Sequence, residues 1–135
     1  SDLDDAAIKL EAQIKTDAGT VTKSAATLRH DADAAFQKND YRTGMTVLGQ
    51  LVAVAPDDSA NWLRLARTVL RIFPRDDRER ALLLDRATTA SYIAYQRANT
   101  RDAEADSLAL LGQTFASRKI WRPALDALRL ALDLH

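Results

Sequence analysis

Apolar side chains recur three and four positions apart along most of this chain, which is the spacing of amphipathic helices. Residues 3–17 illustrate it, because four apolar side chains there form one stripe: Leu3, Ala7, Leu10 and Ile14. Only 4 glycines and 3 prolines occur among the 135 residues, so little interrupts such helices. Further helices are predicted at 24–38, from 59 toward Pro74, at 77–98, and within 103–119 and 121–135. We therefore expect an all-α fold with six or seven helices.

The segment KNDYRTGMTVLGQLVAVAPDD, residues 38–58, is ambiguous by itself. Its three valines favour a strand. Each of its two glycines, Gly44 and Gly49, weakens a helix by about 1 kcal/mol relative to alanine. The repeat pattern described next decides between the two readings in favour of a helix over residues 41–55.

A first-helix pattern and a second-helix pattern follow one another in the C-terminal segment SLALLGQTFASRKIWRPALDALRLAL. The first helix carries Leu108, Leu111, Gly112 and Phe115, and the second carries Trp121, Ala124, Leu128 and Ala131. The first-helix pattern also occurs earlier, at Trp62, Leu65, Ala66 and Val69 and, more loosely, at Leu28, Ala32 and Ala35. Ala32 and Ala66 lie 34 positions apart. This arrangement strongly resembles the tetratricopeptide repeat, a helix pair of 34 residues.

The resemblance implies a short, curved, right-handed stack of antiparallel helix pairs in one domain. An N-terminal helix at 3–17 would precede repeat-like units at about 25–58, 59–104 and 105–135, the middle unit having a long second helix. In this register Tyr41 begins a second helix, Gly44 is a small residue where two helices approach closely, and Trp62 and Trp121 belong to the core. A four-helix bundle is the structural alternative.

Charge and residue types exclude several functions. Lys plus Arg and Asp plus Glu each total 19, so no global field attracts nucleic acid, and the longest uncharged run, 43–56, is too short to span a membrane. There is no cysteine, no phosphate-binding loop and no nucleophile elbow. His30, Asp31 and Asp33 do not share one face of a helix, which argues against a metal site. We expect no cofactor, no metal and no enzymatic activity.

Tetratricopeptide folds bind extended peptides in a groove lined by the first helices, so the resemblance implies a protein or peptide partner. By register, the groove would be lined by Arg29, Asp33, Gln37, Leu63, Arg67, Leu70, Arg71, Gln113 and Ser117. Arg29 and Asp33 stand where the family's carboxylate clamp has lysine and asparagine, which argues against binding of acidic chaperone tails. Arg67 and Arg71, one turn apart, are the best anchor for a partner carboxylate.

Residues 20–135 also resemble the helical region near the N-terminus of large bacterial alpha-2-macroglobulin-like proteins. The points of likeness are WLRLA at 62–66, RER at 78–80, SYIAYQRA at 91–98 and WRPALDALRL at 121–130. Those proteins are exported, envelope-associated protease traps. The resemblance implies an interaction or spacer module of such an inhibitor in the periplasm, without the reactive thioester because cysteine is absent. The alternative is a free-standing peptide-binding adaptor in the cytoplasm. Because Ser1 opens the chain, we expect a processed chain or a piece of a larger protein.

The last predicted helix is rich in leucine. Leu125, Leu128 and Leu132 form one stripe, with Leu130 and Leu134 beside it. Part of this surface should pack against the helix that begins near Glu104, and the rest should stay open. We expect Leu130, Leu132 and Leu134 to form a docking surface for an adjoining domain of the parent chain or for a second copy.

Overall fold

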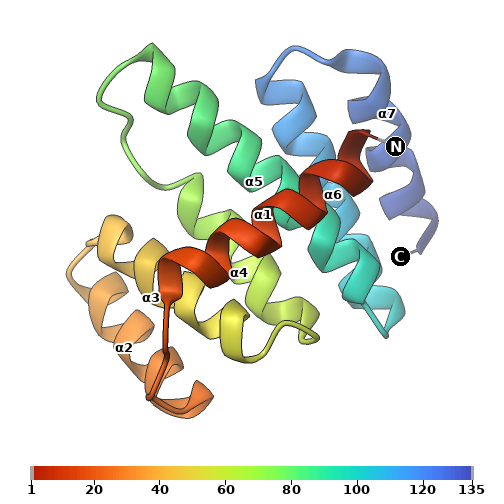
Figure 1. Ribbon diagram of the computed structural model, residues 1–135. Helices are drawn as coiled ribbons and strands as arrows, with labels where there is room; N and C mark the ends of the chain where they lie inside the picture. The colour runs from red at the N-terminus through yellow and green to blue at the C-terminus, as the bar shows by residue number, and fades with distance from the viewer. Residues whose placement is uncertain (1, 135) are drawn as a thin grey trace.

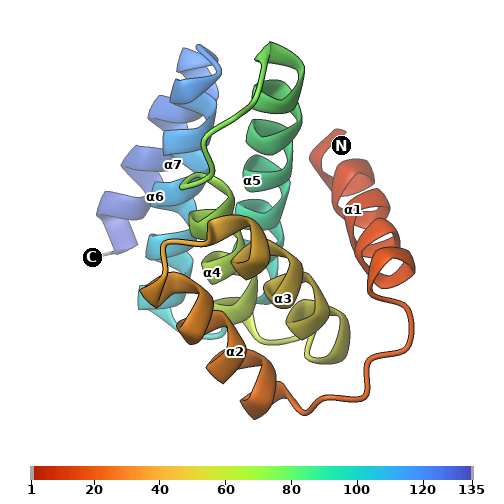
Figure 2. The same ribbon diagram turned by 90° about the vertical axis from the view of Figure 1, so that its left-hand side faces the viewer.

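The computed structural model of the chain describes residues 2–134, and that part is all-α, with seven helices and no strand (Figure 1). The helices are α1 (Asp2–Ala18), α2 (Ala25–Gln37), α3 (Tyr41–Val54), α4 (Ser59–Val69), α5 (Asp77–Arg97), α6 (Arg101–Ser117) and α7 (Trp121–Leu134). The predicted all-α fold is confirmed, and the ambiguous segment is helix α3. Helices α2–α3, α4–α5 and α6–α7 form consecutive pairs across the molecule, and α1 packs against α3 and α5 (Figure 2).

Short polar side chains determine where several helices begin. Asp58 and Asp76 accept hydrogen bonds from the backbone N–H groups of Ala60 and Glu79. Asp40 and Thr100 do the same at the starts of α3 and α6. These contacts satisfy backbone donors that have no partner inside the helix, which fixes the first turn of each helix.

The turns inside α2–α3 and α6–α7 are alike. Asn39 and Lys119, 80 positions apart, both adopt left-handed backbone conformations, with φ of 56° and 59°. The next backbone N–H in each turn donates back to the preceding helix, from Asp40 to the Ala35 carbonyl at 2.9 Å and from Ile120 to the Phe115 carbonyl at 2.8 Å. The second helices, α3 and α7, are each 14 residues long. The first and last pairs are therefore two copies of one helix-pair architecture.

Two glycines allow the paired helices to approach closely. A Cβ atom at Gly44 would lie 2.6 Å from the Phe36 ring, and one at Gly112 would lie 2.8 Å from the Leu128 side chain and 3.0 Å from the Ala124 carbonyl oxygen. An added Cβ atom would therefore clash at both glycines. The close approach predicted at Gly44 on α3 is present, and a second one occurs at Gly112 on α6.

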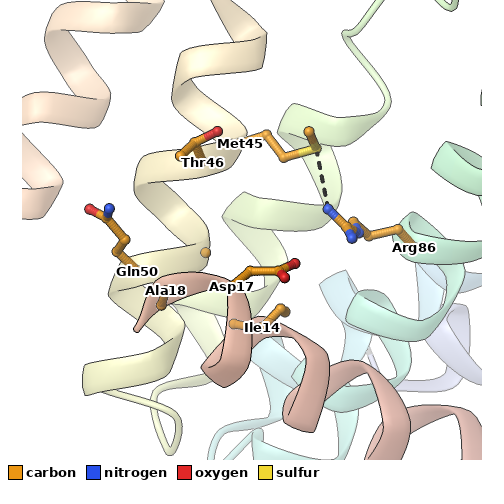
Figure 3. A pocket seen from close by; sticks show the side chains of 8 residues that line it. Ile14, Asp17, Ala18, Met45, Thr46, Gln50 and Arg86 are labelled. Carbon is orange, nitrogen blue, oxygen red and sulfur yellow. Dashed lines mark hydrogen bonds between the residues drawn. The ribbon is translucent and has the colours of Figure 1, made fainter. Parts of the chain in front are cut away.

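Gly49 has a different setting. A Cβ atom there would meet nothing within 4 Å, because the residue borders a small pocket of about 120 Å³ between α1, α3 and α5 (Figure 3). In that pocket the Arg86 guanidinium approaches the Met45 sulfur at 3.8 Å. The volume is well below that of a typical ligand site. Gly49 therefore costs helix stability without a packing role.

The main core lies among α1 to α6 and has Trp62 as its largest fully buried side chain. The indole N–H of Trp62 donates to the Pro56 carbonyl at 2.7 Å, so its polar atom is satisfied. Ala7 and Ile14 bury one side of α1 against this core. Arg97 reinforces the attachment by donating to Glu11 at 2.8 Å.

The prediction that Trp121 is a core residue is wrong, since its side chain is 61% exposed. Its equivalent in the first pair is Tyr41, which Arg71 of the next pair covers at 4.8 Å from the ring centroid. Within residues 2–134 no helix follows α7 to cover Trp121 in the same way. Burial at this position depends on the neighbouring pair and not on the residue itself.

The two tryptophans should therefore differ in thermal and urea unfolding. Trp62→Ala should lower the free energy of unfolding by about 3–5 kcal/mol, because it empties a fully buried site. Trp121→Ala should change it by less than about 1 kcal/mol, because a mostly exposed side chain loses little burial. Equal losses for both variants would contradict the exposed position of Trp121.

The glycines provide a second comparison by the same measurement. Gly112→Leu should lower the free energy of unfolding by about 1–3 kcal/mol, because the added side chain overlaps Leu128 and the α7 backbone. Gly49→Ala is the control and should raise it by about 0.5–1 kcal/mol through better helix propensity. A neutral Gly112→Leu would mean that α6 and α7 are not in close contact.

Candidate interaction groove

An open groove of about 610 Å³ crosses α2, the start of α3, α4 and α6. It is lined by Phe36, Tyr41, Arg64, Arg67, Thr68, Leu70, Arg71, Leu110 and Gln113. We call this surface the arginine groove, because three arginines line it and no acidic residue does. The arginines share one stripe because positions three and four apart lie on the same side of a helix. The surface therefore combines concentrated positive charge with aromatic and aliphatic contact area.

Two of the three arginines are held against aromatic rings. The Arg64 guanidinium carbon lies 4.8 Å from the centroid of Phe36, and Arg64 also pairs with Asp33. Arg71 lies 4.8 Å from the Tyr41 ring centroid, and its Nη2 donates to the Tyr41 hydroxyl at 2.8 Å. The two rings are themselves neighbours, with centroids 6.1 Å apart. Cation–π contacts of this kind fix the orientation of the guanidinium groups.

Arg67 lies between these two arginines along the stripe and differs from both. Its side chain is exposed, and within residues 2–134 it makes no hydrogen bond or ion pair. Its guanidinium therefore keeps all five N–H donors for a partner from outside the chain. An arginine in this state fits a carboxylate or another planar anion through two parallel hydrogen bonds.

The structure brings together four of the residues predicted for this surface: Arg67, Leu70, Arg71 and Gln113. Asp33 reaches its margin through the ion pair with Arg64, whereas Arg29 pairs with Asp58 at 3.6 Å. Gln37 is exposed near the end of α2, and Ser117 lines a neighbouring pocket that also contains Arg71 and Phe73.

Leu63 corrects the prediction, because it is buried in the main core and does not line the groove. Helix α4 is in contact with α3, α5 and α6, so its first turns are enclosed on several sides. Helical spacing predicts which side chains share one side of a helix, but it does not predict which of them neighbouring helices cover.

The sequence interpretation also missed five groove residues: Phe36, Tyr41, Arg64, Thr68 and Leu110. The spacing of Arg64, Arg67 and Arg71, three and four residues apart, was the available signal for Arg64.

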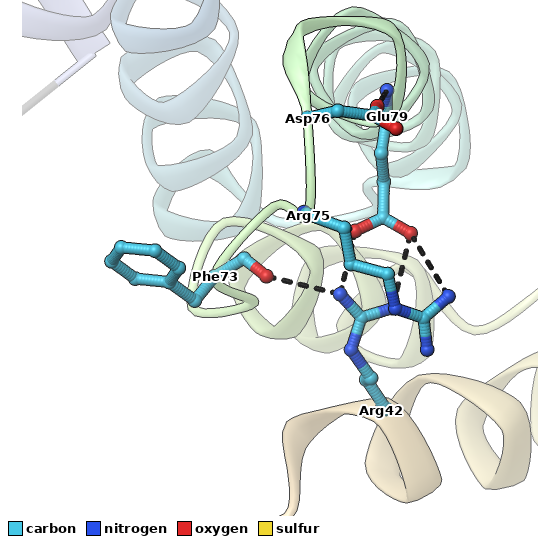
Figure 4. Close-up of polar contacts among 5 residues, drawn as sticks. All are labelled: Arg42, Phe73, Arg75, Asp76 and Glu79. Atoms are coloured by element: carbon cyan, nitrogen blue, oxygen red, sulfur yellow. Dashed lines mark hydrogen bonds and ion pairs between the residues drawn. The ribbon is translucent and has the colours of Figure 1, made fainter.

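A second polar cluster holds the connection between α4 and α5 beside the groove (Figure 4). Arg42 donates two hydrogen bonds to Glu79, at 3.1 Å and 2.6 Å, and a third to the Phe73 carbonyl at 3.0 Å. The Glu79 carboxylate also accepts from the Arg75 backbone N–H at 2.9 Å. These contacts tie α3, the connection and α5 together. The Phe73 side chain is left 89% exposed and borders the same pocket as Arg71.

The Arg42 cluster also determines the charge of its carboxylate. Hydrogen bonds from Arg42, followed by the one from the Arg75 backbone, lower the pKa of Glu79 from 4.5 to about 2. The same hydrogen bonds to Glu79 raise the pKa of Arg42. Both groups are therefore charged across the physiological range, and the connection stays attached to α3.

The part of the chain that the structure describes holds neither a metal-binding cluster nor a membrane-spanning helix. Within residues 2–134, no group of three His, Cys, Asp or Glu side chains is arranged to hold a metal ion. The helices described there include none that is long and apolar enough to cross a membrane. A scan against protein-family models and a search of the curated proteins gave no match. The resemblances to tetratricopeptide repeats and to alpha-2-macroglobulin-like proteins therefore stay predictions.

The Arg42–Glu79 contact should make stability depend on pH below about 4.5. The folded-state pKa of Glu79 is depressed, so its contribution is fully present above the unfolded pKa and is lost as pH falls toward about 2. Glu79→Gln should melt at a lower temperature than the unmodified chain at pH 7, and the difference should shrink between pH 4.5 and 2.

The control for this series is Asp77→Asn, which removes the same charge from the same turn of α5 without breaking the Arg42 contact. Its melting temperature should follow the pH dependence of the unmodified chain. If Glu79→Gln keeps a constant difference at every pH, the ion pair does not depress the pKa of Glu79.

Proposed function

We propose that this chain is a non-enzymatic protein-interaction module that binds an acidic peptide segment in the arginine groove. The observation that carries the proposal is Arg67, an exposed arginine without a partner among residues 2–134, between two arginines that aromatic rings hold in place. The chain has no net charge, so the positive groove is a local feature and not a consequence of composition. Local charge of one sign selects partners of the opposite sign.

The groove offers both parts of a peptide-binding surface. Arg67 and Arg71 supply paired donors for a carboxylate, from a side chain or from a peptide C-terminus. Leu70 and Leu110 supply apolar contact beside them. Gln113 adds an amide that both donates and accepts hydrogen bonds, which suits a peptide backbone. The combination favours a segment in which acidic residues alternate with apolar ones.

A second candidate function follows from the resemblance of residues 20–135 to alpha-2-macroglobulin-like proteins. In that setting the chain is an interaction or spacer module of an exported protease inhibitor, located in the periplasm or cell envelope, and its partners include adjoining domains. An apolar face on α7 that no described helix covers favours a module with a neighbour. The free-standing adaptor, in the cytoplasm, is the alternative. The full-length coding sequence decides between them, since a thioester motif or a long β-rich extension supports the inhibitor.

Peptide binding is tested by fluorescence anisotropy with three labelled probes. The first is a short peptide of alternating Glu and Leu with a free C-terminus, the second is its C-terminal amide, and the third has Lys in place of each Glu. The acidic probes should bind and the basic one should not, and affinity should fall as salt rises. Arg67→Ala should weaken binding of the acidic probes about tenfold or more, because a charged hydrogen-bonding partner is lost.

Arg78→Ala is the matched control, because Arg78 is an exposed arginine on the first turn of α5 and does not line the groove. It should leave the affinity unchanged. Equal binding of acidic and basic probes, or equal effects of the two arginine variants, would overturn the proposal. Weaker binding of the amide than of the free acid would assign Arg67 to the C-terminal carboxylate.

A further inference from the structure

The leucines predicted as a docking surface on α7 do not form one surface. Leu132 is 75% exposed, and Leu130 lies about 160° away from it around the helix, at about 100° per residue. Leu134 is partly buried against Leu108 and Leu111. The expected grouping of Leu130, Leu132 and Leu134 is therefore wrong, because helical rotation separates them.

A second pocket, of about 420 Å³, opens directly beside the arginine groove. It lies between the connection from α4 to α5, the first two turns of α5 and the end of α6. Leu70 and Arg71 line both the pocket and the groove, so the two hollows adjoin each other. The volume falls within the range of ordinary ligand sites, about 300–1,000 Å³. We call this hollow the Phe73 pocket, after the exposed aromatic side chain in its lining.

The lining of the Phe73 pocket is mostly apolar. Ile72, Leu83 and Leu84 all contribute to it. Ile72 is buried, and Leu83 packs against the main core, so these walls are fixed from behind. A preformed apolar hollow of this kind gains free energy when an apolar side chain fills it and removes its surface from water.

The backbone on both sides of Phe73 is held in place. Arg42 donates to the Phe73 carbonyl at 3.0 Å, and the Arg75 backbone N–H donates to Glu79 at 2.9 Å. Pro74, between them, restricts the backbone further. The Phe73 ring nevertheless is 89% exposed and points away from this cluster (Figure 4). An aromatic side chain presented by an ordered backbone loses little conformational entropy on binding, which favours a role in contact with a partner.

The charges around the Phe73 pocket have the same sign as those of the arginine groove. Of the described residues, Arg71 and Arg80 line the pocket and no acidic side chain does. The Arg80 guanidinium has no hydrogen-bond or ion-pair partner within residues 2–134. An apolar pocket flanked by cations fits an apolar residue that stands among acidic ones.

We propose that the Phe73 pocket receives a bulky apolar side chain, aromatic or large aliphatic, from the acidic segment that the arginine groove binds. The inference rests on the proposed peptide-binding function and adds a second requirement for the ligand. Continuity supports this occupant, because Leu70 and Arg71 belong to both hollows. Charge supports it as well, because arginines line both hollows and repel a basic ligand.

The distance between the two hollows limits where the apolar residue stands in the ligand. The backbone from Arg67 to Arg71 keeps a helical course, since the Arg71 N–H donates to the Thr68 carbonyl at 3.0 Å. Four residues at about 1.5 Å each place Arg71 about 6 Å beyond Arg67. Two residues of an extended peptide span about 6.6 Å. The apolar residue therefore lies within about three residues of the carboxylate that Arg67 binds.

Fluorescence anisotropy with matched acidic probes tests the pocket. The first probe is a nine-residue peptide of alternating Ser and Glu with Phe at its centre, so that Glu stands one and three positions away on both sides. The second probe has Ala at the centre. The Phe probe should bind the unmodified chain about tenfold or more tightly than the Ala probe, because only Phe buries a large apolar side chain in the pocket.

Three variants locate the effect. Phe73→Ala should reduce the difference between the probes to less than about threefold and leave the affinity for the Ala probe unchanged. Leu82→Ala is the matched control, because Leu82 is 60% exposed in the second turn of α5 and does not line the pocket, so it should keep the full difference. Arg67→Ala should weaken both probes by the same factor. Circular dichroism of each variant verifies that the helices remain folded.

The outcomes separate the pocket from the groove. If both acidic probes bind equally tightly to the unmodified chain, the Phe73 pocket is overturned while the peptide-binding function stands. The pocket is also overturned if Leu82→Ala reduces the difference between the probes as much as Phe73→Ala does. If neither acidic probe binds, the peptide-binding function and the pocket are both overturned.

Discussion

The close approach of two helices within a pair is the constraint on which this structure depends. Gly112 leaves no space for a Cβ atom against α7, and Gly44 leaves none against the Phe36 ring of α2. The left-handed residues Asn39 and Lys119 turn the chain back at the distance that this contact requires. Once turn and contact are fixed, the second helix of a pair has little freedom to rotate or slide. The side of the second helix that faces the next pair is therefore determined as well.

The geometry of the arginine groove depends on the close contact between α2 and α3. The Phe36 ring packs against Gly44 and also supports the Arg64 guanidinium. Tyr41, at the first residue of α3, supports Arg71 in the same way. Arg64 lies on α4 and Arg71 in the turn directly after it, so the aromatic residues of the first pair orient the cations of the second. Between them, the Arg67 guanidinium has no hydrogen-bond or ion-pair partner within residues 2–134. Packing within the first helix pair thus orients the charged side chains that the second helix pair contributes to the groove.

The three- and four-residue spacing of apolar side chains was enough to predict the helices. The glycine at 44 resolved the ambiguous segment, since a small residue at a helix crossing outweighs its poor propensity. Four of the nine candidate groove residues line the groove. Leu63 and Trp121 were misplaced because exposure is decided by neighbouring helices, which a periodic pattern does not describe. The ion pair between Arg42 and Glu79 joins residues 37 positions apart, and no local signal predicts such a contact.

The two open surfaces of this chain rest on different physics. The arginine groove attracts through exposed charge, which dissolved salt screens over about 8–10 Å at physiological concentrations. The exposed side of α7 with Trp121, Leu125, Leu128 and Leu132 is mainly apolar. Contact of this side with another apolar surface gains free energy by removing area from water, which salt does not screen. Sulfate and similar salts strengthen that burial because they are excluded from protein surfaces. Raising the ionic strength therefore distinguishes the two surfaces. It weakens electrostatic binding in the arginine groove, whereas apolar contact on α7 is preserved. Both surfaces arise from one architecture of helix pairs: the groove forms where α2, α3, α4 and α6 meet, and the apolar side of α7 stays exposed within residues 2–134.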